Sequence, residues 1–366
     1  MKIWDMKILR PISILAGSLM LATAASAQIS LTPPAAEPPA AAKPAPKAAP
    51  KPPVAAKRPP APVAAPKPPA TPSPPVAAAP TPAPDDPNVD VVYGAYQRGQ
   101  YRTAFDLATA RAQAGDPKAM TMLGELYSNA LGIKRDYGKG GYWYKRAADA
   151  GDREAMFALA MMRIAGRGGP LDKQDGVRLL ASAAKLGEPK AAYNLALLYL
   201  DGQTLPQDVK RSAELLRMAA DAGNPEAQYA LATFYKEGTG VEKDVQKAVR
   251  LLQAASLADN VDAEVEYAIA LYNGTGTPKN EVAAVALLRK AARQNSPIAQ
   301  NRLARVLTSG QGTPVDKVEA LKWHLIAKTA GKGDPELDEA LAGLSADDRA
   351  KAEEAARRWL GAAAAK

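Results

Sequence analysis

The sequence is poor in the residues that most enzyme active sites use. It contains no cysteine, one histidine (His324) and only three phenylalanines among 366 residues. Without cysteine the chain forms no disulfide, has no thiolate nucleophile and cannot be anchored as a lipoprotein through cysteine. One histidine is too few for a histidine-based metal site or a Ser-His-Asp triad, so we predict no metal and no cofactor. We expect His324, beside Trp323, to be a packed or surface residue rather than a ligand.

Catalytic motifs are also missing from the sequence. There is no Walker loop and no nucleophile elbow. The stretches "GTGVEKD" and "GTGTPKN" are rich in glycine, but they lack the Lys-Ser/Thr pair of a phosphate-binding loop and they recur with the period described below. We therefore predict that the chain is not an enzyme and has no catalytic residues.

Residues 1–27 have the layout of a secretory signal peptide. Lys2, Lys7 and Arg10 precede the apolar run "ISILAGSLMLATA", which ends at Ala25-Ser26-Ala27. A positive start, a short apolar middle and a small-residue cleavage site predict export and cleavage after Ala27. The expected location is the periplasm of a bacterium. The alternative is an uncleaved signal that anchors the chain in the inner membrane.

Residues 28–87 are dominated by proline, alanine and lysine. Proline lacks an amide donor and favours extended backbone, so this composition predicts a disordered, polyproline-like linker. Its positive charge is compatible with weak contact to anionic envelope polymers, or with a solvated linker that has no partner. Residues 88–366 are only mildly basic. That balance does not predict nucleic-acid binding.

From residue 115 onward the sequence repeats every 36 residues. The repeat-opening glycines are Gly115, Gly151, Gly187 and Gly223, and later turn glycines are Gly238, Gly274 and Gly310. Each opening glycine suits a left-handed helix C-terminus, and the acid and proline after it suit the start of the next helix. A second acid or Asn recurs 21 residues on, from Asp136 to Asp316, where it is expected to cap the second helix or brace the turn.

Each unit is therefore predicted to be a helix-turn-helix hairpin that must stack on its neighbours to bury its apolar faces. The predicted fold is all-α: a right-handed α-solenoid with six units over residues 115–330, a divergent helical unit at 88–114, and capping helices and a tail at 331–366. Ser345 is the expected N-cap of the last helix. Gly140-Gly141 and Gly176 fall inside second helices, where glycine is unfavourable, and are expected to loosen the hairpins locally.

The unit "AGNPEAQYALATFYKEGTGVEKDVQKAVRLLQAAS" resembles the Sel-one-like repeat, a 36-residue relative of the tetratricopeptide repeat. The matching residues are Ala227, Leu231, Tyr235, Gly238, Gly240, Val241, Asp244, Ala248, Ala254 and Ala255. The resemblance implies a partner groove on the concave face, built chiefly from the first helix of each hairpin.

The sixth and tenth residues after the opening glycine lie one turn apart on the first helix of each hairpin. Together they form an apolar stripe. The candidate partner-binding residues are Phe157, Met161, Tyr193, Leu197, Tyr229, Thr233 and Ile269. Core packing between adjacent units explains the same stripe, and the family's usual aromatic residue at the sixth position favours that interpretation.

The resemblance implies a protein-binding scaffold or regulatory adaptor of the cell envelope, with a protein partner and no small-molecule cofactor. The alternative function is a protein that interacts with the cell wall, through peptidoglycan or β-lactams, or a weak hydrolase. That alternative follows from disulfide-rich secreted relatives, whose cysteines this chain lacks.

Overall fold

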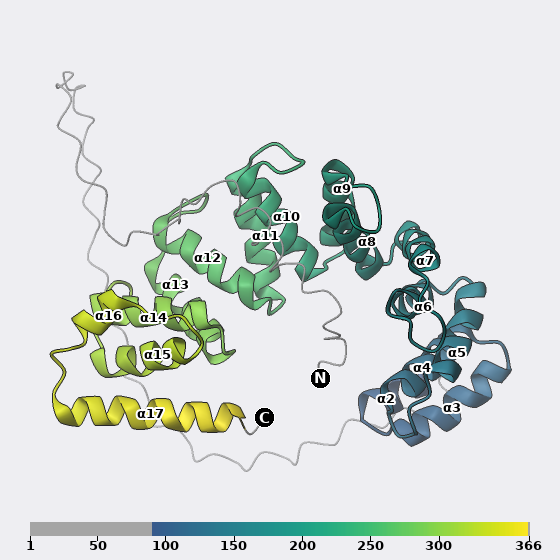
Figure 1. Cartoon of the computed structure of the whole chain (residues 1–366), viewed down its shortest axis with the longest axis horizontal. Helices are drawn as coiled ribbons and strands as arrows, with labels where there is room; N and C mark the ends of the chain where they lie inside the picture. Colours follow the sequence, from purple (N-terminus) through teal and green to yellow (C-terminus); the bar gives the residue numbers. More distant parts are fainter. Residues whose placement is uncertain (1–89, 365–366) are drawn as a thin grey trace, which may run out of the picture. The chain divides into compact units, whose positions relative to one another are not determined.

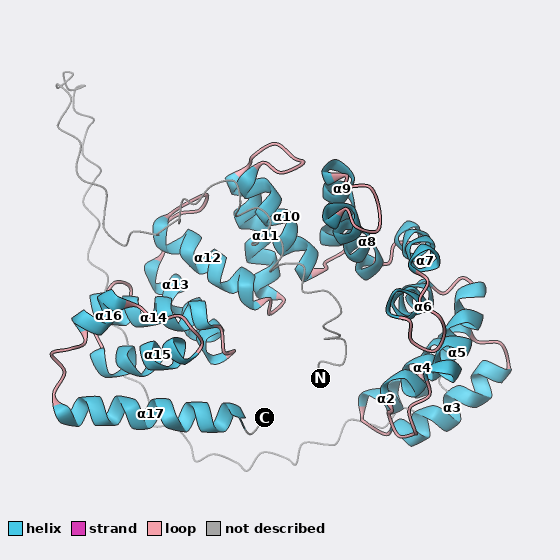
Figure 2. Cartoon of the chain, in the orientation of Figure 1, coloured by secondary structure: helices cyan, strands magenta, loops and turns pink. Residues whose placement is uncertain are grey.

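A computed structural model describes residues 90–364, which form sixteen helices and no strand within that range (Figures 1 and 2). The predicted signal peptide and the predicted linker lie outside the described residues. The helices alternate between first and second members of hairpins. The first helices are α2 (Val91–Gln97), α4 (Pro117–Asn129), α6 (Arg153–Ala165), α8 (Pro189–Asp201), α10 (Pro225–Glu237), α12 (Val261–Asn273), α14 (Pro297–Ser309) and α16 (Pro335–Ala340). The second helices are α3 (Tyr101–Gln113), α5 (Tyr137–Asp149), α7 (Lys173–Lys185), α9 (Val209–Asp221), α11 (Val245–Leu257), α13 (Glu281–Arg293) and α15 (Lys317–Thr329). The last helix is α17 (Ala346–Ala364).

The junction between units has the predicted conformation. Gly115 has φ 96°, and Asp259 and Asn295, which replace glycine in two units, have φ values of 60° and 63°. Asp116 caps α4 by accepting a hydrogen bond of 2.9 Å from the backbone N–H of Lys118. The left-handed residue turns the chain and the following acid satisfies the amide groups that the new helix leaves free.

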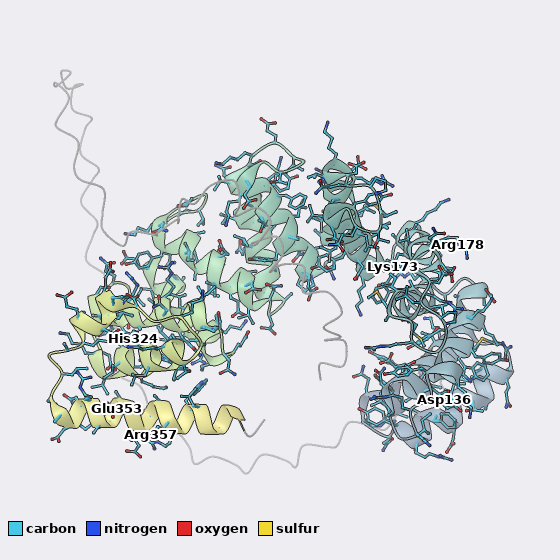
Figure 3. All side chains as sticks on the ribbon, viewed as in Figure 1. Asp136, Lys173, Arg178, His324, Glu353 and Arg357 are labelled. Carbon is cyan, nitrogen blue, oxygen red and sulfur yellow. The ribbon has the colours of Figure 1, made fainter. Side chains whose placement is uncertain are left out.

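The second helices are capped by the acid or amide that recurs 21 residues after the opening glycine. Asp136, labelled in Figure 3, accepts a 2.9 Å hydrogen bond from the backbone N–H of Lys139 at the start of α5. The equivalent N-cap residues are Asp172, Asp208, Asp244, Asn280 and Asp316. The repeated acid therefore caps a helix in every unit.

The hairpins stack in sequence and share one row of small buried residues. Extensive contacts join each helix to the next from α2 to α15. The alanines four residues after the opening position are fully buried from the second unit onward: Ala155, Ala191, Ala227, Ala263 and Ala299. Small side chains here let helices of adjacent units approach closely, and this seam is the core of a solenoid.

Two of the three glycines inside second helices pack closely against the first helix of their own hairpin. Gly140 is buried in α5 against Ser128 and the carbonyl of Gly124, and a Cβ atom on Gly176 would lie 3.1 Å from the carbonyl oxygen of Ala160. Close packing therefore offsets the low helix propensity of glycine at positions 140 and 176, whereas Gly141 has open surroundings.

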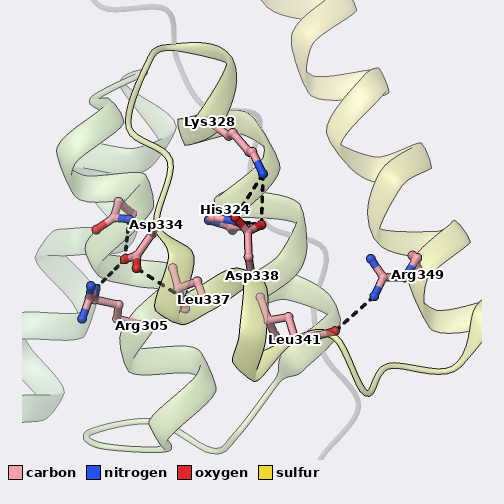
Figure 4. Close-up of polar contacts among 9 residues, drawn as sticks. Arg305, His324, Lys328, Asp334, Leu337, Asp338, Leu341 and Arg349 are labelled. Atoms are coloured by element: carbon pink, nitrogen blue, oxygen red, sulfur yellow. Dashed lines mark hydrogen bonds and ion pairs between the residues drawn. The ribbon is translucent and has the colours of Figure 1, made fainter.

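The carboxyl-terminal end carries one more first helix, α16, which is shorter than the others. Its N-cap, Asp334, accepts hydrogen bonds from Arg305 Nε at 2.6 Å and from Asn301 Nδ2 at 2.9 Å (Figure 4). These contacts tie α16 to α14. The pKa of Asp334 is lowered by the hydrogen bonds from Asn301 and Arg305, against an opposing effect of its burial.

His324 is a packed residue in this region. It is fully buried in α15, and its Nε2 lies 2.8 Å from Asp338 Oδ1 (Figure 4). Lys328 donates to both oxygens of the same carboxylate at 3.1 Å. Hydrogen bonds from His324 and Lys328 lower the pKa of Asp338. The single histidine therefore joins α15 to α16.

The last helix, α17, packs on α15 in place of a regular second helix. Ser345 accepts a 3.1 Å hydrogen bond from the backbone N–H of Asp348, in agreement with the predicted N-cap. Trp359 meets Trp323 edge to face, with ring centroids 5.1 Å apart, and donates to Asn295 Oδ1 at 3.2 Å. An aromatic contact and a hydrogen bond thus hold α17 over the end of the stack.

Candidate partner-binding surface

The surface formed by α2, α4, α6, α8, α10, α12 and α14 is here called the first-helix face. The seven sequence-predicted residues belong to four of these helices, α6, α8, α10 and α12. Phe157 is 9% exposed and Leu197 is 5% exposed, so both belong mainly to the packing between helices. The other five are half-buried: Met161, Tyr193, Tyr229, Thr233 and Ile269. Those five keep part of each side chain on the surface. Their contact with a partner stays a prediction.

The two tyrosines of the central units are phenols near carboxylates of the following unit. Burial, with the charge of Glu226, raises the pKa of Tyr193 to about 12. Burial also raises the pKa of Tyr229, and the charges of Glu266 and Asp262 add to it. Both phenols are therefore protonated at neutral pH and offer an O–H group on the first-helix face.

At the two ends of the array, the sixth residue after the opening position makes a hydrogen bond to the next first helix. Thr121 donates a 3.1 Å hydrogen bond to Asp152, the N-cap of α6. Asn301 does the same to Asp334, the N-cap of α16. The polar residues at this position therefore join consecutive first helices, whereas the tyrosines in the middle make no such bond in the part of the chain that the structure describes.

A pocket of about 670 Å³ opens on the first-helix face at the amino-terminal end of the array. Residues from α2, α4 and α6 and the start of α8 form most of its wall, and Arg111 of α3 and Tyr144 of α5 complete it. Phe157 is the one predicted residue that lines it. Its volume falls within the range of pockets that bind small molecules or single side-chain anchors.

A buried carboxylate lies in the wall of this pocket. Glu125 is 9% exposed and accepts hydrogen bonds from Tyr144 Oη at 3.1 Å and Tyr96 Oη at 3.4 Å. Burial raises the pKa of Glu125, while the hydrogen bonds from the two phenols and the charge of Lys190 lower it in part. Burial and the neighbouring Glu125 charge raise the pKa of Tyr96 and of Tyr144, so both remain hydrogen-bond donors.

The absence of a side chain at Gly124 allows this arrangement. A Cβ atom there would lie 2.5 Å from the Tyr144 ring, well inside van der Waals contact. Tyr144 can thus cross from α5 to α4 and place its hydroxyl on Glu125. Glycine at this position thus permits the close approach of α4 and α5.

Charged pairs surround the pocket. Arg111 donates to Asp90 at 3.0 Å and to Asp116 at 2.8 Å. Arg153 donates to the carbonyl oxygens of Leu186 and Gly187, each at 3.2 Å. These guanidinium groups thus hold α2, α3 and α8 around the pocket.

A family model for the Sel1 repeat matches six consecutive segments of the sequence: residues 117–152, 153–188, 189–224, 225–260, 261–296 and 297–332. These segments cover more than half of the chain. The chain belongs to the Sel1 repeat family.

Solved structures with this fold agree. A Sel1 repeat protein from Oxalobacter formigenes is 27% identical, with a TM-score of 0.59, over 65% of this chain and 98% of that chain. The protein c5321, a protective antigen present in uropathogenic Escherichia coli strains and displaying an SLR fold, is 25% identical with a TM-score of 0.50, over 70% of this chain and 64% of that chain. No curated protein sequence matches the chain. Proteins built from Sel1 and related repeats generally mediate protein–protein interaction and are typically non-enzymatic scaffolds.

Within the Sel1 array, sequence reasoning missed the pocket carboxylate and its two phenols. The available signal was position: Glu125 is the tenth residue of its unit, where other units carry Met161, Leu197 or Ile269. Glu125 is the only acid in this row, which also contains Thr233 and Arg305. Its partners, Tyr96 and Tyr144, come from outside that row and were not predictable from it.

Residues 90–364 contain no group of three or more His, Asp or Glu side chains arranged to hold a metal ion. In the same range, none of the helices combines the length and apolar character needed to cross a membrane.

Proposed function

We propose that this Sel1 repeat protein is a non-enzymatic scaffold or regulatory adaptor that binds a protein partner along its first-helix face. The observation that carries the proposal is the combination of half-buried side chains on consecutive first helices with the pocket at the amino-terminal end of the same face. Partly buried aromatic and aliphatic side chains next to a pocket are features of energetically important contacts in protein interfaces.

The central tyrosines are the expected anchors of this interface. Tyr193 and Tyr229 sit one repeat apart on α8 and α10, and each presents a rigid ring with a protonated hydroxyl. Tyrosine loses little conformational entropy on binding and combines apolar area with one donor. These two positions are therefore the best sites for capturing a partner.

Photo-crosslinking in cells tests the assignment of the face. A photoreactive phenylalanine analogue replaces Tyr193 or Tyr229, and matched controls carry it at Leu257 and Val282, which are 79% and 70% exposed on second helices. We expect the same discrete protein adduct from both tyrosine positions and none from the controls. Adducts that arise only from Leu257 or Val282 would overturn the assignment.

We further propose that the protein works in the periplasm of a bacterium. The support is the charged start, apolar run and small-residue cleavage site of residues 1–27. Sequencing the amino terminus of the protein recovered from a periplasmic extract is expected to begin at Gln28. A protein that stays in the membrane fraction and still begins at Met1 would instead indicate an anchor.

A further inference from the structure

The pocket at the amino-terminal end of the first-helix face combines a buried carboxylate with aromatic walls. We propose that it takes a lysine or arginine side chain of the partner protein, with the cationic end directed toward the Glu125 carboxylate. This inference rests on the proposed scaffold function and specifies the chemistry that one part of the scaffold recognises.

Glu125 retains the capacity to accept further hydrogen bonds. An ionised carboxylate has about four acceptor sites, and the side chain of Glu125 accepts one hydrogen bond from each phenol. An ammonium or guanidinium donor beside it would form a charge-assisted hydrogen bond, which is stronger than a bond from a neutral group. The buried position excludes much of the water that would weaken such a bond.

The aromatic wall suits a cation. Tyr93 and Tyr96 of α2 stack with ring centroids 6.5 Å apart, and Phe157 of α6 also lines the pocket. Aromatic faces attract ammonium and guanidinium groups through the ring quadrupole, and they also pack the methylene stem of lysine or arginine. Tyr93 is 52% exposed, so its ring is accessible at the entrance.

The charge balance of the wall favours a cation over an anion. Five carboxylates line the pocket (Asp90, Glu125, Asp152, Glu154 and Glu188) against four cationic side chains (Arg111, Lys118, Arg153 and Lys190). The two arginines are already engaged with carboxylates and carbonyl groups, and Lys190 lies near enough to Glu125 and Glu188 to lower the pKa of both. An acidic ligand would have to bury a second negative charge beside Glu125, which is unfavourable.

Methyl NMR of the full mature chain tests the proposal directly. With 13C-methyl methionine, the signal of Met122, which lines the pocket, reports occupancy. The probes are Nα-acetyl-lysine methylamide, its uncharged analogue Nα-acetyl-norleucine methylamide, and Nα-acetyl-glutamate methylamide. We expect the lysine probe to bind at least tenfold more tightly than either of the others.

Three variants then locate the effect. Glu125→Gln keeps an acceptor for the phenols and is expected to weaken the lysine probe about tenfold while leaving the norleucine probe unchanged. Tyr93→Ala, at an exposed position outside the core, is expected to weaken lysine severalfold. The matched control is Glu237→Gln on the surface of α10, which is expected to have no effect. Unchanged signals from the other methionines would show that each variant is folded.

Equal affinity for lysine and norleucine, tighter binding of the glutamate probe, or a lysine affinity that survives Glu125→Gln would each overturn the proposal. Failure of this pocket proposal can be distinguished from failure of the proposed scaffold function. Crosslinks from Tyr193 and Tyr229 without lysine selectivity would overturn only the pocket assignment, whereas lysine selectivity without those crosslinks would overturn the larger partner surface.

Discussion

At the scale of single residues, the pocket depends on one missing side chain. Gly124 leaves the space through which the Tyr144 ring reaches Glu125, and any Cβ atom at this position would overlap the ring. By contrast, Gly141 in α5 has open surroundings, with its nearest neighbour, Met162 Cε, 3.6 Å from an added Cβ. A Cβ atom is therefore excluded at position 124 and accommodated at position 141.

Gly124→Ala is expected to lower the free energy of unfolding by about 1–3 kcal/mol, the usual cost of overpacking a core. Gly141→Ala is expected to raise it by up to about 1 kcal/mol, because alanine is the better helix former and nothing obstructs it. Urea unfolding followed by circular dichroism measures both. If the two alanine variants shifted stability in the same direction, the close-approach argument would fail.

The raised pKa of Glu125 gives a prediction about pH. In the window between the unfolded pKa of glutamate, about 4.3, and the higher folded value, the native state binds more protons than the unfolded chain. Stability contributed by this group is therefore lost as pH rises through the window. The free energy of unfolding of Glu125→Gln, compared with that of wild type, is therefore expected to increase as the pH rises from 4 to 7.

Thermal melts at a series of pH values provide the measurement. Glu237→Gln, at an exposed position, serves as the control and is expected to show no such trend. A pH-independent difference between Glu125→Gln and wild type would mean that Glu125 titrates alike in the folded and unfolded chain.

At the scale of helices, three consecutive joints between units, α9–α10, α11–α12 and α13–α14, use a polar residue at the same position of the repeat. Gln228 and Gln300 each donate a 3.2 Å hydrogen bond to a carbonyl at the end of the preceding second helix, that of Ala220 and Ala292 respectively. The equivalent residue between them is Glu264, which is fully buried and pairs with Lys290 Nζ at 2.7 Å. The middle joint thus uses an ion pair where its neighbours use a neutral amide.

Lys290→Met is expected to lower the free energy of unfolding by about 3 kcal/mol, because it leaves a buried carboxylate without its cation. Adding Glu264→Gln should restore stability to within about 1 kcal/mol of wild type, since the amide can bond as Gln228 and Gln300 do. Lys243→Met, on an exposed turn, is the control and should change stability by less than about 0.5 kcal/mol. Additive effects of the Lys290 and Glu264 substitutions would contradict this account.

The local elements were predictable because their causes lie within a few residues. Left-handed Gly115, the cap at Asp116 and the cap at Asp136 each follow from neighbouring backbone chemistry, and the structure agrees with all three. The environment of Glu125 was not predictable, because its phenols arrive from α2 and α5 and depend on how whole helices pack. The benefit of Gly140 in a second helix was missed for the same reason.

At the scale of the whole molecule, the array is stabilised one neighbour at a time. Extensive contacts run between consecutive helices, and α17 closes the last unit by packing on α15. In such a stack the loss of an end affects the adjacent unit most and distant units little. The carboxyl-terminal cap is therefore expected to act locally.

A chain that ends at Ser345 lacks α17 and exposes the face of α15 that carries Trp323. Amide hydrogen exchange should become at least tenfold faster in α14 and α15, while protection in α8 and α10 remains unchanged. Mass spectrometry of exchanged peptides resolves these helices. Uniform loss of protection along the array would show that the units unfold together rather than from the end.

The concentration of contacts between helices that are neighbours along the chain also affects how the protein reaches its native state. Each hairpin finds its partners within a few dozen residues along the chain, so closing the contacts requires only short loops. A polypeptide emerging amino terminus first, from a ribosome or through a membrane channel, can assemble its leading hairpins while the trailing ones are still threading. The pocket around Glu125 is then complete once α8 has formed, long before α17 emerges.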